Sequence, residues 1–228
     1  MAHARRSFVI WGGGGHGKVV ADLVRALGQD VFGYVDRESS RLGQIAEPGG
    51  GRVLLTEESL LAAINEPGRH PTEFDAVAIA VGNNAQRQVC ARQIVGYDLP
   101  PLVHPTAVCS PSATFGRGTV VFPLAVVNAG ASVGEAVIVN SGAIIEHDCV
   151  LEDAVHVSPG ATMGGGVRVA ERSWIGAGAT IVQGISIGRD VIVGAGAVII
   201  RDVPDGVTIV GNPGRVLGDE IGRRNQRS

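Results

Sequence analysis

The amino-acid sequence predicts two regions of different fold class, an α/β domain followed by an all-β domain built as a parallel β-helix. Two observations predict this division. In residues 1–101, short apolar segments alternate with segments of helical periodicity. Beyond them, an apolar residue recurs at every sixth position from Val103 to Ile199. We therefore expect an α/β domain over residues 1–101, a β-helix over residues 102–218 and a tail over residues 219–228.

The composition fits this division and argues against several classes of protein. The chain has 228 residues with 34 glycines, 4% aromatic residues and a formal net charge of −3. This charge gives no reason to expect nucleic acid as a partner, and no apolar run is long enough to span a membrane. The three cysteines lack the spacing of disulfides or metal ligands, so we expect reduced, packed thiols and no metal. Without an apolar leader segment, we expect a cytoplasmic protein.

The first domain is expected to alternate strands with helices in the order of a nucleotide-binding fold. Its helices are marked by periodicity and end signals: Val19, Leu23 and Leu27 share one face of the first, Gly28 ends it, and Thr56 is the N-cap of the second. The expected strands are "SFVIWG" (7–12), "VFGYVD" (31–36) and "DAVAIAVG" (75–82), and the expected helices are "KVVADLVRAL" (18–27), "TEESLLAAI" (56–64) and "NAQRQVCARQIV" (84–95).

The glycine-rich segment "GGGGHGKVV", residues 12–20, fits two phosphate-binding patterns. A P-loop needs Ser or Thr after its lysine to hold magnesium, and Val19 stands there instead. The pattern G-x-G-x-x-G is matched by Gly12, Gly14 and Gly17, between a strand and a helix. Asp36 ends the next strand, where ribose hydroxyls are bound in Rossmann folds. These features favour a Rossmann-like half domain.

About 100 residues suffice for only one mononucleotide-binding half of such a fold. We therefore expect a mononucleotide or a nucleoside diphosphate as the ligand, with its phosphates at the N-terminus of the first helix. A tightly packed βα turn without a ligand is the alternative. The expected binding residues are Gly12, Gly14, His16, Gly17, Lys18, Asp36, Gly82, Asn83 and Asn84.

The six-residue period of the second domain predicts how its chain is wound. Each hexad supplies one short strand and one turn, and three hexads make one triangular coil. The apolar column fills the interior of this prism. Four residues after each apolar position, a column from Ala107 to Val203 contains only small or β-branched residues, which suit the corners. No hexad buries its apolar residue alone, so stacking of coils must supply the stability.

Five segments in order resemble the sialic acid O-acetyltransferase/nucleotide-sugar N-acetyltransferase family, whose hexapeptide repeats form a left-handed β-helix. They are "GGGGHGKVVADLV", "VFGYVD", "IAVGNNAQR", "NSGAIIEHDCVLEDAVHVSPGA" and "IVGNPGRV". The resemblance extends from Phe8 to about Leu217. It implies a homotrimer, acetyl-CoA as donor and a nucleotide-linked amino sugar as the usual acceptor.

Acyl transfer requires a base that removes a proton from the attacking amine or hydroxyl, and a neutral imidazole suits this role near pH 7. We expect His147 to be that base. The resemblance implies that the next residue, Asp148, orients it, with Glu146 as the alternative. It also matches His156 to a second histidine near the acetyl carbonyl, where a backbone N–H near Gly165 could serve too. Asn140 is expected to position the acceptor or the thioester.

The hexad phase places the catalytic candidates on the outside of the prism, and on different faces. Asn140 and His156 are expected to share one edge, whereas His147 would meet such an edge only on a neighbouring subunit. We therefore expect active sites between subunits of a three-fold ring. Coenzyme A is expected along the groove between prisms, near the glycine-rich turns and the segment "GNPGRV". The expected coenzyme-binding residues are Gly165, Gly176, Gly194, Gly211, Pro213 and Arg215.

Three other functions remain open from the sequence. A sugar O-acetyltransferase would differ by using a hydroxyl acceptor. A zinc-dependent carbonic anhydrase on the same β-helix would need a third histidine beside His147 and His156. A nucleotide-sugar sensor without catalysis would bind its ligand and not turn it over. The leading hypothesis is an acetyl-CoA-dependent N-acetyltransferase acting on a nucleotide-linked 4-amino-4,6-dideoxy sugar, with UDP, GDP and dTDP all possible as the nucleotide.

Overall fold

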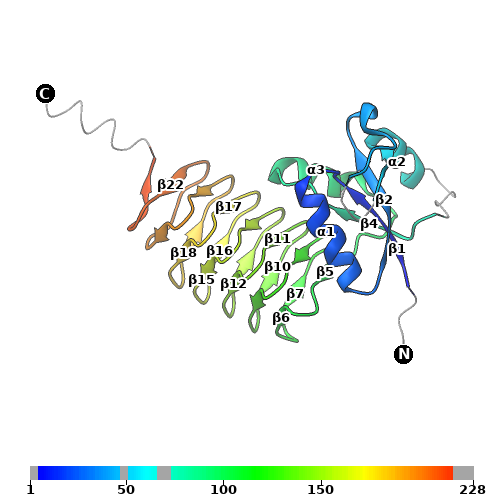
Figure 1. The fold of residues 1–228 in the computed structure, drawn as a ribbon. Helices are drawn as coiled ribbons and strands as arrows, with labels where there is room; N and C mark the ends of the chain where they lie inside the picture. The colour runs from blue at the N-terminus through cyan, green and yellow to red at the C-terminus, as the bar shows by residue number, and fades with distance from the viewer. Residues whose placement is uncertain (1–4, 47–50, 66–72, 218–228) are drawn as a thin grey trace, which may run out of the picture. The chain divides into compact units, whose positions relative to one another are not determined.

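The chain forms two compact units that divide between Pro105 and Thr106, and each is described here by itself. The tail expected over residues 219–228 lies outside the described residues. The computed structural model describes residues 5–46, 51–65 and 73–217 (Figure 1).

The first unit is a parallel sheet with helices between its strands, as the sequence predicts. The strand order is β3-β2-β1-β4, and each neighbouring pair is parallel. Its elements are β1 (Ser7–Trp11), α1 (Gly15–Ala26), β2 (Asp30–Asp36), the 3-10 helix η1 (Ser39–Arg41), β3 (Val53–Thr56), α2 (Glu57–Asn65), β4 (Ala76–Ile79), α3 (Asn84–Gln93) and β5 (Leu102–Val103).

The strands that the sequence predicts are the ones with a strong apolar signal. All four residues of β4 are buried, and β1 is buried from Phe8 to Trp11. β3 has no counterpart among the predicted strands. It lies at the edge of the sheet and only Val53 of its four residues is buried, so its apolar signal is weak.

The first helix confirms its predicted end and corrects its predicted face. Gly28 has a φ of +71° and donates its N–H to Arg25 O at 2.9 Å, which is a glycine helix stop. The sequence predicts one shared face for Val19, Leu23 and Leu27, but Val19 is 43% exposed whereas Leu23 is 1% exposed. The helix begins at Gly15, and its buried residues are Gly17, Val20, Ala21, Leu23 and Val24.

The second unit is a left-handed parallel β-helix of two-residue strands. Its strands are β6 (Val108–Cys109), β7 (Thr114–Phe115), β8 (Val120–Val121), β9 (Val126–Val127), β10 (Ser132–Val133), β11 (Ile138–Val139), β12 (Ile144–Ile145), β13 (Val150–Leu151), β14 (His156–Val157), β15 (Thr162–Met163), β16 (Arg168–Val169), β17 (Trp174–Ile175), β18 (Thr180–Ile181), β19 (Ser186–Ile187), β20 (Ile192–Val193), β21 (Val198–Ile199), the longer β22 (Thr208–Val210) and β23 (Arg215–Val216).

Three sheets form the faces of the prism (Figure 1). Within this unit they follow the orders β8-β11-β14-β17-β20-β22-β23, β6-β9-β12-β15-β18-β21 and β7-β10-β13-β16-β19. Partners such as Val139 and Val157 lie 18 residues apart, so three hexads make one coil. The last coil is shorter, because Ile187 forms a bridge with Val203.

The predicted apolar column is the core of the prism. Every sixth residue from Val121 to Ile199 is at most 3% exposed. The first three positions of the column, Val103, Cys109 and Phe115, are half-buried. The stack therefore removes one apolar side chain per hexad from water, which is the main source of its stability.

Polar members of the second column are buried and hydrogen-bonded to the backbone. Thr119 Oγ1 donates to Gly134 O at 2.7 Å, Ser173 Oγ to Gly188 O at 2.6 Å, and the Cys149 thiol to Gly164 O at 3.2 Å. Each bond satisfies a polar atom that would otherwise be costly to bury. Cys90, Cys109 and Cys149 are free thiols, as predicted.

A third column, at the corners, has left-handed backbone conformation. Every sixth residue from Gly118 to Gly196 has a positive φ. Glycine occupies most of these positions, since other residues pay about 1–2 kcal/mol for this conformation. The exceptions are Leu124, Ala136, Asp148, Ala154, Arg172 and Asp190.

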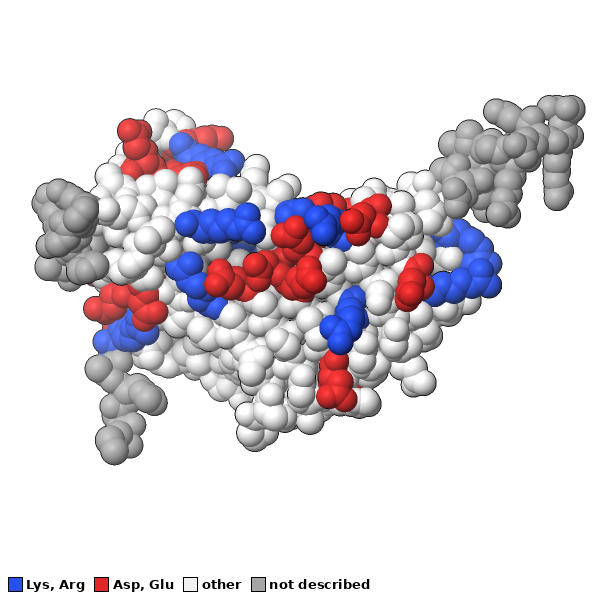
Figure 2. Space-filling model, turned by 180° about the vertical axis from the view of Figure 1, so that it is seen from behind, with Lys and Arg blue, Asp and Glu red and all other residues white. Residues whose placement is uncertain are grey.

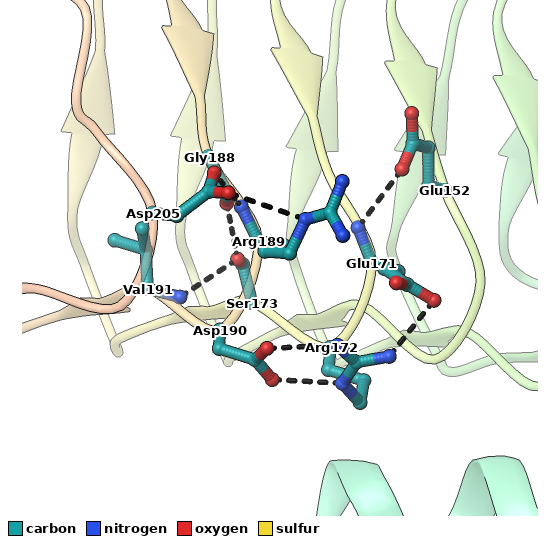
Figure 3. Close-up of polar contacts among 9 residues, drawn as sticks. All are labelled: Glu152, Glu171, Arg172, Ser173, Gly188, Arg189, Asp190, Val191 and Asp205. Carbon is teal, nitrogen blue, oxygen red and sulfur yellow. Dashed lines mark hydrogen bonds and ion pairs between the residues drawn. The ribbon is translucent and has the colours of Figure 1, made fainter.

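Charged residues link neighbouring coils at one corner of the prism (Figure 3). Arg172 donates to both carboxylate oxygens of Asp190, at 2.8 and 2.7 Å, and also pairs with Glu171 at 2.8 Å. Arg189 pairs with Asp205 at 3.2 Å. On the face that Figure 2 shows, acidic side chains in the middle of the view have basic side chains next to them.

The stacked core leads to a stability prediction with a matched control. Val193→Ala removes a side chain that is 1% exposed and should lower the free energy of unfolding by about 2 kcal/mol, through lost burial and a residual cavity. Val182→Ala makes the same chemical change at a position that is 37% exposed and should cost less than about 0.5 kcal/mol. Chemical denaturation of the two variants makes the comparison, and equal losses would contradict it.

Candidate active site

His147 and Asp148 form a pair at the corner between β12 and β13. His147 Nδ1 lies 2.8 Å from Asp148 Oδ2, and the two side chains are 64% and 73% exposed. With Nδ1–H donating to the carboxylate, Nε2 of the neutral ring is left to accept a proton. The hydrogen bond to Asp148 raises the pKa of His147 more than desolvation lowers it, and the charges of Asp148 and Glu146 raise it further by smaller amounts.

Glu146 has a different partner, although it also precedes the corner. Asn128 Nδ2 donates to Glu146 Oε2 at 3.0 Å. Asp148 is therefore the carboxylate that orients His147 in this structure, and Glu146 acts on the imidazole only through its charge.

Asn140 and His156 lie together, on the neighbouring face. Asn140 Nδ2 is 3.4 Å from His156 Nε2, and Asn140 Oδ1 accepts the N–H of Ser141 at 2.9 Å. The His156 ring stacks on Trp174, with ring centroids 5.6 Å apart and an interplanar angle of 6°. Trp174 Nε1 donates to Ser158 Oγ at 2.7 Å, which fixes the indole. Sequence reasoning missed Trp174, although it lies one coil beyond His156.

The two groups occupy different corners of the prism. Asn140 follows β11 in the turn that leads to β12, whereas His147 follows β12 in the turn that leads to β13. The coil path therefore separates the imidazole of His147 from the Asn140–His156 pair along one chain, as the hexad phase predicts.

The glycines expected to bind coenzyme A have close neighbours on the next coil. A Cβ added at Gly176 would lie 2.5 Å from Val193 O, and one at Gly194 would lie 2.8 Å from Val210 Cγ1. Packing between coils thus explains both glycines. A Cβ at Gly165 would instead lie 2.5 Å from His147 Nε2, so this glycine is packed against the candidate base.

The segment near the end of the β-helix has its own backbone features. Gly211 has a φ of +91°, and the bond between Asn212 and Pro213 is cis. Arg215 is exposed in β23, where its Nη1 donates to Gly214 O at 2.9 Å.

In the first unit, the glycine loop lies where the strand order reverses. β1 is flanked by β2 and β4, so the carboxyl ends of β1 and β4 border the crevice in which α/β folds bind ligands. Gly12 has a φ of +130°, and a Cβ there would lie 2.5 Å from Ala80 O. A Cβ at Gly17 would lie 2.1 Å from Gly12 O. Gly14, the N-cap of α1, has open space around it.

Charged and polar groups surround this loop. Lys18 is exposed in the first turn of α1. Asp36 accepts a hydrogen bond from Arg41 Nη1, and Arg41 Nη2 donates to Gly13 O at 3.2 Å. The carboxylate expected to bind ribose is therefore held by an arginine that sequence reasoning missed. Arg37, the residue after Asp36, pairs with Glu57 at 2.8 Å.

The segment after β4 has a buried arginine behind it. Asn83 caps α3 by accepting the N–H of Gln86 at 3.0 Å, and Asn84 Oδ1 accepts Arg87 Nη2 at 2.8 Å. Arg87 is 1% exposed and also donates to Val81 O and Gly82 O, each at 3.1 Å. Burial lowers its pKa to about 9.

His16, in the first turn of α1, is a second residue of this crevice whose pKa is lowered. Burial, with a smaller effect of the Arg87 charge, lowers its pKa to about 4, so its imidazole is neutral at pH 7. In the segment after β4, the hydrogen bonds of Asn83, Asn84 and Arg87 hold the backbone that borders the crevice. The spacing of three residues between Asn84 and Arg87, one helical turn, is the sequence signal that could have revealed this contact.

Comparisons with known proteins agree with this architecture. Residues 7–94 match the PglD N-terminal domain, and residues 166–201 match the bacterial transferase hexapeptide repeats. The acetyltransferase domain of PglB from Neisseria gonorrhoeae FA1090, solved in complex with acetyl coenzyme A, is 41% identical with a TM-score of 0.84, over 94% of this chain and 100% of that one. The chain belongs to the nucleotide-sugar N-acetyltransferase family of left-handed β-helix proteins.

Two further similar proteins are named as N-acetyltransferases of nucleotide-linked sugars. A histidine-to-alanine variant of GDP-perosamine N-acetyltransferase from Caulobacter crescentus, in complex with CoA and GDP-perosamine, is 37% identical with a TM-score of 0.83, over 93% of this chain and 97% of that one. The UDP-N-acetylbacillosamine N-acetyltransferase of Bacillus subtilis (strain 168) is 37% identical over 123 residues, so this match spans about half the length of that relative, 51%.

Two features are absent from the residues that the structure describes. Among residues 5–46, 51–65 and 73–217, no three His, Cys, Asp or Glu side chains are grouped so that they could hold a metal ion. No helix of that same part of the chain is long and apolar enough to cross a membrane.

The glycine loop leads to a prediction that tests whether Gly17 is needed for close packing against Gly12. Gly17→Ala places a methyl group against the carbonyl of Gly12 and should lower the stability of the first unit by about 1–3 kcal/mol. Gly15→Ala enters open space at the start of the same helix and should leave stability unchanged or raise it. Thermal unfolding followed by Trp11 fluorescence, in a Trp174→Phe background, reports on this unit alone. Equal midpoints for the two variants would refute the packing argument.

Proposed function

We propose that this protein is an acetyl-CoA-dependent N-acetyltransferase acting on the amino group of a nucleotide-linked 4-amino-4,6-dideoxy sugar, with His147 as general base. The observation that carries the proposal is the exposed His147–Asp148 pair on the β-helix of an acetyltransferase family. A carboxylate holds one nitrogen of the imidazole and leaves the other able to take a proton. No metal is needed for this chemistry.

The proposed reaction is a direct transfer. As the sugar nitrogen attacks the thioester carbonyl carbon, His147 Nε2 removes the proton from that nitrogen. A C–N bond forms, and the carbonyl oxygen becomes negatively charged. When the C–S bond breaks, the imidazolium returns the proton to the sulfur, and the products are the N-acetylated sugar and the free thiol of coenzyme A.

Asp148, His156 and Asn140 assist this step in the proposal. Asp148 fixes the tautomer of His147 and stabilises the imidazolium that forms, as the carboxylate of a catalytic triad does. His156, held by Trp174 and contacted by Asn140, is oriented to donate to the developing oxyanion or to the acetyl carbonyl. The backbone N–H of Gly165, next to the imidazole, is a second candidate donor.

The first unit holds the nucleotide of the acceptor. Its glycine loop and the N-terminus of α1 suit a diphosphate, and Lys18 adds positive charge. For the ribose hydroxyls to reach Asp36, Arg41 must share or release its carboxylate. Binding energy from this remote part of the substrate serves to position the amino group for attack.

The donor is proposed to lie along the β-helix and to be shared between subunits. Gly176 and Gly194, where the coils pack closely, are proposed to lie near the pantetheine, while Gly211, Pro213 and Arg215 lie near the adenine and its phosphates. Because His147 and the Asn140–His156 pair occupy different corners, a closed three-fold ring that brings one corner against the neighbour's edge completes the site. This geometry supports a homotrimer.

The proposal is tested with a panel of UDP-, GDP- and dTDP-linked amino sugars and acetyl-CoA, monitored by release of the coenzyme A thiol. Thiol release with one 4-amino sugar is expected, and His147→Ala should lower kcat by about 10²–10⁴-fold. Release only with a hydroxyl acceptor would identify an O-acetyltransferase. Binding of a nucleotide sugar without turnover, unchanged by His147→Ala, would identify a sensor.

The pH profile tests the role of Asp148. Because Asp148 raises the pKa of His147, the neutral base is lost on the acidic side of that raised value. Asp148→Asn should therefore move the acidic limb of kcat/KM to lower pH while lowering the plateau at least about tenfold, since the amide no longer stabilises the imidazolium. An acidic limb that stays in place would show that another group titrates there.

A further inference from the structure

The corner that carries His147 and Asp148 continues through the neighbouring coils. On the coil before it lie Ala129 and Gly130, and on the coil after it lie Gly165 and Gly166. Asp148 N donates to Ala129 O at 2.9 Å, and Gly166 N donates to His147 O at 2.8 Å. These bonds fix the spacing of the three turns, so the side chains of the pair must fit between fixed backbones.

The carboxylate of Asp148 uses space that Gly130 leaves open. A Cβ at Gly130 would lie 2.6 Å from Asp148 Oδ1, closer than carbon and oxygen approach without a bond. Asp148 cannot yield by a backbone shift, because its N–H is bonded to the preceding coil and its φ of +59° is already unusual. The carboxylate would have to rotate, which would break its 2.8 Å contact with His147.

The imidazole of His147 uses space that Gly165 leaves open on the opposite side. A Cβ at Gly165 would lie 2.5 Å from Nε2 and 2.6 Å from Cε1 of that ring. The three nearest atoms to such a Cβ all belong to His147. Gly165 is not in the left-handed region, so its backbone conformation does not demand glycine.

We propose that Gly130 and Gly165 are positioning residues of the acyl-transfer site, whose missing side chains form a slot that holds the His147–Asp148 pair in its reactive arrangement. Gly130 acts on the base through Asp148, whereas Gly165 acts on the imidazole directly. The inference rests on the proposed role of His147 and extends it to two glycines on separate coils.

Gly184 offers a matched control for Gly130. Both glycines lie at the same corner, and both have a φ of +72°. Alanine at either position therefore carries the same backbone strain, but a Cβ at Gly184 meets no atom within 4 Å. Gly130→Ala and Gly184→Ala should have similar thermal midpoints, so a difference in activity reports on the contact with Asp148.

The experiment compares the two variants by turnover and by NMR titration of His147. Gly130→Ala should lower kcat about tenfold or more with little change in KM, and it should move the acidic limb of the pH profile to lower pH, as Asp148→Asn does. Gly184→Ala should stay within about twofold of the unaltered enzyme. In an Asp148→Asn background, Gly130→Ala should add less than about a twofold loss, because the contact it disturbs is already altered.

The NMR titration keeps this inference separate from the proposed function. It follows the His147 ring without turnover, and Gly130→Ala should lower the pKa of that ring whereas Gly184→Ala should not. If thiol release fails with every acceptor while the titration differs as expected, the proposed function is wrong and the slot stands. Equal titrations and equal kcat for the two variants would overturn the slot.

Gly165→Ala keeps the test decisive if Gly130→Ala does not fold. This variant carries no left-handed strain, and it should displace the imidazole and lower kcat at least about tenfold. A Gly165→Ala enzyme with unchanged kcat and an unchanged His147 titration would refute the proposed role of Gly165 in positioning the imidazole.

Discussion

The in-register stacking of one coil on the next is the constraint on which the β-helix and its site depend. Each coil except the last repeats after 18 residues, so its side chains lie above the residues 18 positions earlier. Apolar positions then meet only apolar positions, and small residues meet at the corners. The buried apolar column thus fixes the backbone that carries the polar side chains on the outside.

The same stacking determines what the exposed residues can do. His147 and Asp148 lie at one corner, Asn140 lies at the next, and His156 belongs to the coil stacked on Asn140. Trp174, one further coil along, holds the ring of His156. A rigid prism gives precise placement, but it also separates groups that acyl transfer needs together. The proposed trimer resolves this conflict, because only another copy can bring a different corner to the same donor.

Sequence reasoning succeeded where a contact repeats and failed where it depends on the tertiary approach of distant segments. The apolar column and the strand–glycine loop–helix order follow from local patterns, whereas the pairing of His147 with Asp148 was implied by the family resemblance. Val19 was placed on the wrong face because Val20 and Val24 have the same apolar spacing as Val19 and Leu23, and the fold buries the side that carries Val20 and Val24. Arg41 acts through a loop whose folding no periodicity encodes, whereas the contact of Arg87 with Asn84 could have been found from their helical spacing. Trp174 could have been found by adding one coil length to His156.

The central claim is that His147 removes the proton from the acceptor nitrogen. A crystal structure of the protein with coenzyme A and its nucleotide-linked amino sugar tests this most directly. The claim predicts that the amino nitrogen lies about 3 Å from His147 Nε2, with Asp148 still bonded to Nδ1. An amino nitrogen beyond hydrogen-bonding reach of His147, with a different side chain in contact with it, would contradict the claim.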